Sequence, residues 1–283
     1  MKTLLSLGHG YSAAALARLL LPQGWRVIGT TRSADRAADL TAQGVEPLLW
    51  PGDLGPALQA ASHILVSAGP GPGGDPFLTA YPALREARPE WVGYLSTTSV
   101  YGDHGGGWVD ETTPLHPAKG RGDARVMAET EWLATGLPVH VFRLSGIYGP
   151  GRGPFQKVKA GTARRIIKPG QVFGRIHVDD IARVLEASIR HPNPGAIYNV
   201  TDDLPAPAED VLSHAAALLG LPEPPEVAFE QVVAEMTPMA RSFYMESKRV
   251  RNDRIKRELG VELLYPDYRA GLAAILAAEG APD

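Results

Sequence analysis

The sequence predicts a doubly wound α/β fold, in which a parallel sheet is covered on both faces and a smaller, mainly helical lobe follows. Three observations predict it. Short apolar runs alternate with helix-like segments through the first half of the chain. These runs are almost continuously apolar, which is typical of strands buried on both faces. Beyond residue 150 the alternation ends, glycine and proline cluster, and helical patterns dominate.

The elements follow in order along the chain. The apolar runs that predict strands are 3–7, 25–30, 45–50, 63–68, 91–97 and 139–145. Between them, helical patterns cover 12–21, 34–42 and 125–134, and later ones cover 179–190, 208–219 and 250–259. We therefore divide the chain into residues 1–150, which form the sheet domain, and residues 151–283, which form the smaller lobe. Residues 176–200 are expected to fold back onto the sheet.

Composition excludes several classes of protein. The 283 residues are 44% hydrophobic and 21% charged, which is ordinary for a packed globular chain. The formal net charge of −3 gives no basic footprint for nucleic acid. There are no cysteines, and no two histidines have H-x-x-x-H spacing, so we expect no disulfide and no metal site.

The amino terminus superficially resembles a signal peptide, because one lysine precedes an apolar run. Gly8 and Gly10 break that run, and Arg18 interrupts the next one, whereas a signal peptide needs an unbroken apolar region. No apolar run is long enough to span a bilayer. We expect a cytoplasmic protein that makes no membrane contact.

The first strand is followed by a turn that suits a dinucleotide. It reads G-H-G-Y-S-A, in which Gly8 makes a tight turn, Gly10 lets the backbone approach a diphosphate, and Ala13 packs helix against strand. Tyr11 and Ser12 open the helix, whose unpaired N–H groups would face the phosphates. Taken alone, the motif is equally a tight turn with no ligand; its place between strand and helix favours a Rossmann-type dinucleotide site.

The end of the second strand favours NADP over NAD. An acidic residue there would bind the ribose hydroxyls of NAD, but this chain has Thr31, Arg32 and Ser33, which suit a 2′-phosphate. The nearby Asp35 keeps NAD as the alternative. Further coenzyme contacts are expected after the third and fourth strands, at Asp53, Ser67, Ala68 and Pro70.

Later motifs resemble the extended short-chain dehydrogenase/reductase superfamily, which includes nucleotide-sugar epimerases and dehydratases. They are LSTTSVYG (95–102) followed by Glu111, Pro114 and Pro117, then RLSGIYGPG (143–151), RIHVDDIA (175–182), IYNV (197–200) and SKRVRNDRIKRELG (247–260). The resemblance spans nearly the whole chain. It implies an NAD(P)-binding domain with a substrate lobe, a substrate-orienting role for Thr97, and a place for Tyr148 beside the nicotinamide.

The chain departs from that superfamily at its acid–base pair. Where the family has a tyrosine and a lysine, this sequence has Arg121 and Arg125, with Glu129 where the family's helix keeps a glutamate. A guanidinium stays protonated and cannot exchange a proton as the tyrosine does. The sequence therefore resembles an atypical branch that lacks the Tyr–Lys pair. The two arginines could instead clamp an anionic substrate.

Other residues are candidates to replace the missing pair. Tyr101 and His104 follow the fifth predicted strand, although we favour a packing role for Tyr101 and a solvated loop position for His104. His177 is a candidate substrate contact or a residue that positions the lobe by bonding to Asp179 or Asp180. The basic clusters at 164–168 and 248–257 are either solvated helix faces or, in part, contacts to an anionic ligand.

The sequence leaves two functions open. The first is an NADP-dependent oxidoreductase or epimerase of atypical mechanism, which acts on a sugar-like or phosphorylated small molecule. The second is a non-catalytic NADP(H)-binding redox sensor. We favour the enzyme because a substrate lobe and its cleft are retained. As partners we expect a small-molecule substrate but no nucleic acid, and as assembly a monomer or homodimer.

Overall fold

A parallel sheet forms the centre of the computed structural model, which describes residues 1–71 and 73–280; the side chains of Arg121 and Met239 lie outside this description. The seven strands run in the order β11-β7-β5-β4-β1-β2-β3, and every neighbouring pair is parallel. They are β1 (Thr3–Leu7), β2 (Arg26–Thr31), β3 (Glu46–Leu49), β4 (His63–Val66), β5 (Trp91–Thr97), β7 (Val139–Leu144) and β11 (Ile197–Val200). The predicted fold class is therefore confirmed.

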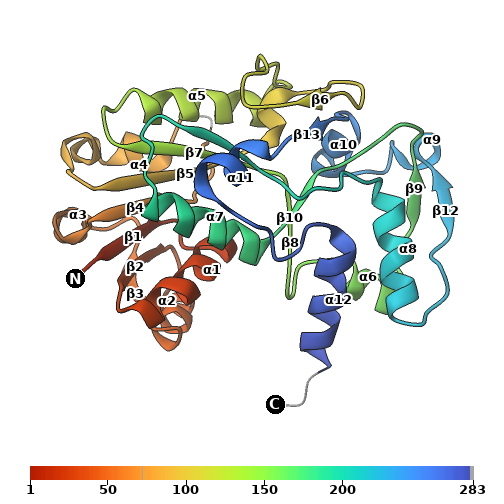
Figure 1. Ribbon diagram of the computed structural model, residues 1–283, viewed down its shortest axis with the longest axis horizontal. Coiled ribbons are helices and arrows are strands. Elements are labelled where there is room, and N and C mark those ends of the chain that lie inside the picture. Colours follow the sequence, from red (N-terminus) through yellow and green to blue (C-terminus); the bar gives the residue numbers. More distant parts are fainter. Residues whose placement is uncertain (72, 281–283) are drawn as a thin grey trace.

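Helices cover both faces of this sheet, and the smaller lobe lies to its right in Figure 1. One face is covered by α1 (Tyr11–Leu20), α2 (Ala34–Ala42), α7 (Val178–Arg190) and α11 (Asp253–Leu259). The other face is covered by α3 (Gly55–Ala60), α4 (Pro76–Ala80) and α5 (Arg121–Leu133). Successive side chains of β1 alternate between the two cores, since Leu4 lies in the first and Leu5 in the second.

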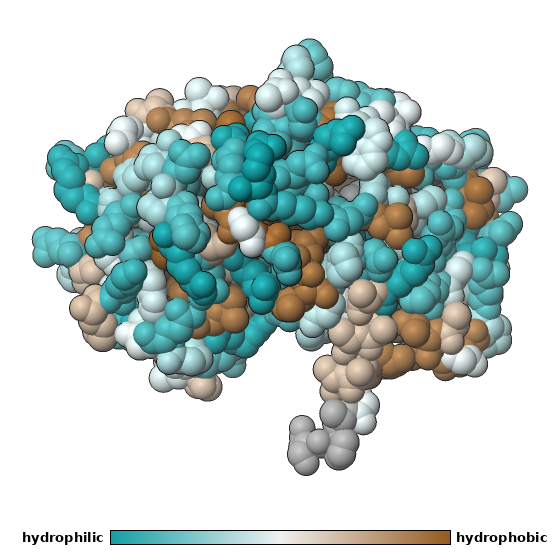
Figure 2. Space-filling view, viewed as in Figure 1, coloured by the Kyte–Doolittle hydropathy of each residue, from teal (hydrophilic) through white to brown (hydrophobic). Residues whose placement is uncertain are grey.

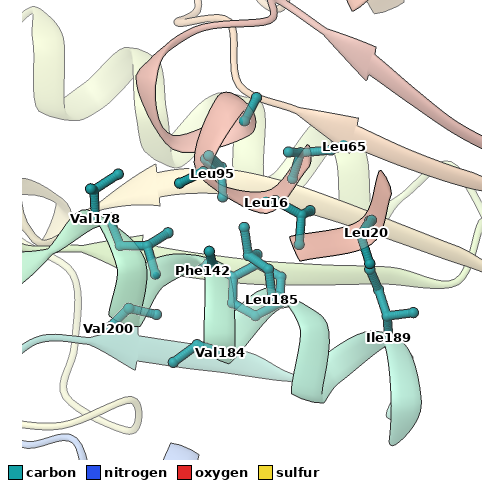
Figure 3. Close-up of a cluster of buried hydrophobic side chains, with 14 of the residues drawn as sticks. Leu16, Leu20, Leu65, Leu95, Phe142, Val178, Val184, Leu185, Ile189 and Val200 are labelled. Atoms are coloured by element: carbon teal, nitrogen blue, oxygen red, sulfur yellow. The ribbon is translucent and has the colours of Figure 1, made fainter. Parts of the chain in front are cut away.

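The first core joins residues that are far apart in the sequence. Leu16 and Leu20 of α1 lie close to Leu185 and Ile189 of α7, and Phe142 of β7 belongs to the same cluster (Figure 3). The buried positions of α7 recur every three or four residues, as expected for a helix that packs one face on a sheet. Residues 176–200 thus supply a covering helix and the edge strand β11 of the central sheet.

The smaller lobe is built around its own apolar cluster. Its helices are α6 (Phe155–Lys159), α8 (Ala208–Leu218), α9 (Phe229–Val232), α10 (Pro238–Tyr244) and α12 (Tyr268–Glu279), and β9 (Arg165–Ile167) pairs with β12 (Glu226–Ala228). Two more parallel pairs connect it to the sheet domain, β8 (Gly146–Tyr148) with β10 (Arg175–His177) and β6 (Trp108–Val109) with β13 (Arg249–Val250). Single 3₁₀ turns are η1 (Leu21–Gln23), η2 (Pro82–Glu86) and η3 (Thr98–Tyr101).

The helix predicted over 250–259 begins later than expected. Residues 249–250 form β13 instead, because Arg249 and Arg251 donate backbone hydrogen bonds to the β6 segment, and α11 begins at Asp253. The helix α5 begins at Arg121, before the predicted start at 125. The helix α12 was not predicted; its Gly271 lies so close to Tyr148 that an added Cβ would be 2.1 Å from the tyrosine hydroxyl.

A buried ion pair connects three strands with the helix α5. Arg143 on β7 donates to Glu129 on α5 at 2.8 Å, and both side chains are only 3% exposed. The Ser96 hydroxyl of β5 donates to the same carboxylate at 2.5 Å. A second Arg143 nitrogen donates to the Tyr101 hydroxyl at 3.0 Å, which in turn donates to Asn199 of β11 at 2.7 Å. The charges are therefore satisfied by one continuous hydrogen-bond network.

The outer surface is mixed in character. On the face shown in Figure 2, polar side chains cover most of the surface, and apolar ones lie in groups among them. Within residues 1–71 and 73–280, we find no helix with the length and apolar character that a membrane crossing requires.

Replacing Arg143 with Met is expected to lower the free energy of unfolding by roughly 3–5 kcal/mol, because Glu129 is left as an unpaired charge in the interior. Urea denaturation followed by circular dichroism measures the change. Lys159→Met is the control, because it breaks an ion pair with Glu279 whose side chains are 49% and 40% exposed, and its loss is expected below about 1 kcal/mol. Equal losses in the two variants would contradict a special role for the buried pair.

Candidate active site

A cavity of about 690 Å³ opens at the carboxyl ends of the central strands and is lined by residues from both lobes. It lies where the strand order reverses, because β1 has β2 on one side and β4 on the other. The first turn, the ends of β4, β5 and β7, the start of α5, and the segments around residues 175 and 244 all contribute to its walls. Open α/β sheets bind their ligands in this crevice.

The glycine turn forms one wall of the cavity. Gly8, Gly10, Tyr11 and Ser12 line it, and α1 begins at Tyr11, so the amino end of a ten-residue helix faces the open space. Gly8 has a φ of +81°, and an added Cβ would lie 2.8 Å from the Ala68 backbone nitrogen. Any larger residue would therefore push the β1 turn away from the β4 loop. Ala13 is fully buried in the core beneath the turn.

The other predicted coenzyme contacts divide into two groups. Ser67 lines the cavity at the end of β4, with Ala68 packed against Gly8 and Pro70 farther along the same loop. The residues after β2 and β3 are not among those that line the cavity. Of these, the Ser33 hydroxyl accepts a hydrogen bond from the Arg36 backbone at the start of α2, and Asp53 accepts one from Gly55. Thr31 is buried and Arg32 is exposed.

Thr97 at the end of β5 and Arg125 on α5 both line the cavity. The Thr97 hydroxyl caps η3 by accepting a hydrogen bond from the Ser99 backbone at 3.3 Å. Arg125 reaches from α5 across the end of β5, where it donates to the Leu95 carbonyl at 2.6 Å and to the Tyr94 hydroxyl at 3.2 Å. Its guanidinium is therefore held in place as a fixed positive charge. Arg121 begins α5, and its side chain lies outside the described part of the structure.

Tyr101, His104 and His177 are not among the residues that line the cavity. The Tyr101 hydroxyl is fully buried in the Arg143 network, and burial raises its pKa. A ring nitrogen of His104 lies 3.2 Å from the Tyr101 carbonyl oxygen. The His177 side chain accepts a hydrogen bond from the Asp179 backbone and so caps α7. These contacts give all three side chains a structural role.

Tyr148 lines the cavity, but its hydroxyl points toward the smaller lobe. It donates to the Asp267 carbonyl at 3.3 Å, just before α12. Burial, with the nearby Asp202 and Asp180 carboxyls, raises the pKa of Tyr148, so it is a weak acid at neutral pH. The ring lies edge-on to His177, with 5.2 Å between the ring centroids.

Several charged residues of the cavity were missed or not singled out from the sequence. Arg152, whose guanidinium lies 5.7 Å from the centroid of the Tyr11 ring, is the one charged residue of the loop GPGRGP. In the sequence, Arg175 stands out only as the first residue of the motif RIHVDDIA, and no pattern marks Glu246 as a site residue. Lys248, from the basic cluster, lines the cavity with its ammonium 2.6 Å from the Glu246 carboxylate and 2.7 Å from the Gly102 carbonyl. A lone cation in a glycine-rich loop was the only available sign of Arg152.

Comparison with known proteins places this arrangement in a family. The profile described as "NAD dependent epimerase/dehydratase family" matches residues 78–201, which include Thr97, Arg125 and Tyr148. "Protein YeeZ" of Escherichia coli K12 is 32% identical over 94% of this chain and 97% of its own length. The chain belongs to the NAD-dependent epimerase/dehydratase family. Arg121 and Arg125 therefore stand within the matched region at the positions where the resemblance expects a tyrosine and a lysine.

Solved structures share the fold over nearly the whole chain. A functionally unknown conserved protein from Silicibacter pomeroyi is 60% identical, with a TM-score of 0.93 over 99% of this chain and 100% of that one. The human epimerase family protein SDR39U1 (isoform 2), solved with NADPH, has a TM-score of 0.77 at 19% identity over 99% of this chain and all of its own. Among the residues described here, no cluster of His, Asp and Glu side chains is suited to hold a metal ion.

His9 lies inside the glycine turn and gives it a pH dependence. Its side chain is 4% exposed, and neither ring nitrogen has a hydrogen-bond partner among the described residues. Burial, with a smaller contribution from Arg36, lowers the pKa of His9 to about 4. The ring is therefore neutral at physiological pH, and protonating it would put an unpaired charge in the interior.

The free energy of unfolding is expected to fall as the pH drops from about 6.5 toward 4, because the unfolded chain then binds a proton on His9 that the folded chain does not. His9→Asn should remove this contribution, about 1–3 kcal/mol across that window. Urea midpoints measured from pH 7 to pH 4 test the expectation. An unchanged pH dependence in the variant would show that the buried ring does not control it.

Proposed function

We propose that this protein is an NADP-dependent oxidoreductase or epimerase that acts on a small molecule without the Tyr–Lys pair. The observation that carries the proposal is the single cavity in which the glycine turn, Thr97 and the smaller lobe meet. A dinucleotide turn needs no second lobe for binding alone, whereas a reaction needs coenzyme and substrate side by side. The cavity supplies space for both.

The residues of the turn fit a coenzyme of this kind. The N–H groups at the start of α1 and the close approach allowed by Gly8 and Gly10 suit a diphosphate, and Arg152 adds a positive charge beside Tyr11. Arg32 and Ser33 would hold the 2′-phosphate of NADP, with Asp35 leaving NAD as the alternative. Proteins of this fold were solved with NADPH, as the human family protein was, and with NAD, as MoeE5 was, so they leave both coenzymes open. Bound here, the nicotinamide ring supplies or accepts a hydride.

The chain's own residues then position the substrate and stabilise charge. The hydroxyl of Thr97 would orient a substrate oxygen. Arg125, fixed by the Leu95 carbonyl, would stabilise negative charge on that oxygen without giving up its proton. The proton of an alcohol product has to come from another group at the cavity or from water. Lys248 lines the cavity and carries exchangeable protons.

The alternative function is an NADP(H)-binding sensor without turnover. Two observations favour it: the Tyr–Lys pair is absent, and Arg125 is held by backbone and side-chain acceptors rather than left free to take part in proton transfer. Both functions require coenzyme binding, so the two tests below separate binding from reaction.

Isothermal titration calorimetry is expected to show that NADP binds more tightly than NAD. Arg32→Ala should weaken NADP by about ten- to a hundredfold and leave NAD nearly unchanged, because the charge-assisted hydrogen bonds to the 2′-phosphate are lost. Arg190→Ala, which removes an exposed charge at the end of α7, is the control. If NAD is weakened as much as NADP, Arg32 does not select the coenzyme.

Mixing NADPH-loaded protein with aldehydes, ketones and conjugated carbonyl compounds is expected to consume reduced coenzyme in a single turnover, followed by its absorbance. Thr97→Val should slow this step by about tenfold or more while the affinity for NADPH stays the same, since the hydroxyl orients substrate rather than coenzyme. Tight NADPH binding with no consumption by any compound would favour the sensor.

A further inference from the structure

The part of the cavity that the smaller lobe builds has an aromatic wall. We call the lining residues from position 172 onward the substrate end. Phe173, Phe243 and Tyr244 line it. The rings of Tyr244 and Phe173 meet edge to face, with 5.6 Å between centroids, and Phe229 supports Tyr244 from behind at 5.4 Å. Rings braced in this way present a rigid apolar surface.

Phe243 adds an unused apolar face to that wall. It lies on α10 and is 49% exposed although it is a large apolar side chain. Scattered apolar side chains on an outer surface need no explanation, but one that lines a concave site next to two other rings marks a binding surface. A flat ring could pack against it.

The cavity is positively charged. Arg175, Lys248 and Glu246 are the charged residues of the substrate end, and Lys119, Arg125 and Arg152 add three cations to the walls of the same cavity. The Lys248 ammonium has three N–H donors, of which two are directed at the Gly102 carbonyl and the Glu246 carboxylate. An anionic acceptor in the cavity would bind to the third. The positive charge of the cavity suits an anionic ligand.

From these observations we infer that the substrate is a planar aromatic compound with an anionic group, such as an aromatic carboxylate, held between the ring wall and Lys248. The inference rests on the proposed function, because it assigns the substrate end of the same cavity. Phe243 and Phe173 would contact the ring, and the Lys248 ammonium would bind the anionic group.

The test uses the full chain saturated with NADP and four probes in calorimetry. trans-Cinnamate is expected to bind. Its neutral amide, cinnamamide, tests the charge, and 3-cyclohexylpropanoate tests the flat ring; each should bind roughly tenfold or more weakly. UDP-glucose represents a nucleotide sugar and should bind least. No binding of cinnamate, equal binding of its amide, or tighter binding of UDP-glucose would overturn the inference.

Two variants locate the binding site. Phe243→Ala is expected to weaken cinnamate by roughly tenfold and leave NADP affinity unchanged. Trp108→Ala is the matched control, because this aromatic side chain is 51% exposed and is not among the residues that line the cavity. It should change neither affinity. Equal effects of the two variants on cinnamate would overturn the assignment of the ring wall.

The two proposals fail in different ways. If the proposed function is wrong, calorimetry shows no NADP binding, or the single-turnover assay shows no oxidation of NADPH. Loss of this inference appears as normal NADP binding with no preference for a planar anion.

Discussion

The buried contact between Glu129 and Arg143 is the constraint on which the site depends. Arg125, which contributes a guanidinium to the cavity, lies one helical turn before Glu129 on α5. Ser96, which donates to that glutamate, directly precedes Thr97 on β5. The pair therefore fixes both the helix and the strand that contribute Arg125 and Thr97 to the cavity wall. Moving two charges from water into the interior costs free energy. The hydrogen bonds that Ser96 and Tyr101 make with the pair offset that cost.

The fold was largely predictable because its signals are local and repeated. Continuous apolar runs mark buried parallel strands, and a glycine turn between strand and helix marks the crevice. Thr97, Arg125 and Tyr148, which line the cavity, were singled out through motifs. The sequence did not predict that Arg152, Arg175 and Glu246 line the cavity. Tertiary structure brings these segments to the edge of the sheet, and no spacing of residues along the chain indicates that approach. The strand β13 escaped for the same reason, since its partner β6 lies far away along the chain.

The histidines and tyrosines show where chemical type alone misleads. Tyr101 and His104 follow the right strand and have suitable functional groups, yet the Tyr101 hydroxyl belongs to the interior and neither side chain lines the cavity. His177 bonds to Asp179 and caps α7, in agreement with the positioning role expected from the sequence. Position after a strand predicts closeness to the crevice, but the direction of the side chain decides whether it meets a ligand.

The edge strand β11 has a consequence for how such chains can change in evolution. After β7 the polypeptide enters the smaller lobe, and it then returns to the sheet domain to form α7 and the edge strand β11. The chain after β11 contributes α8 and the later elements of the smaller lobe. The smaller lobe therefore cannot be replaced as one continuous segment of chain. Removing residues 151–283 would also remove Ile181 and Val200 from the core of the sheet domain. New specificities in this architecture have to arise by replacing loops in place.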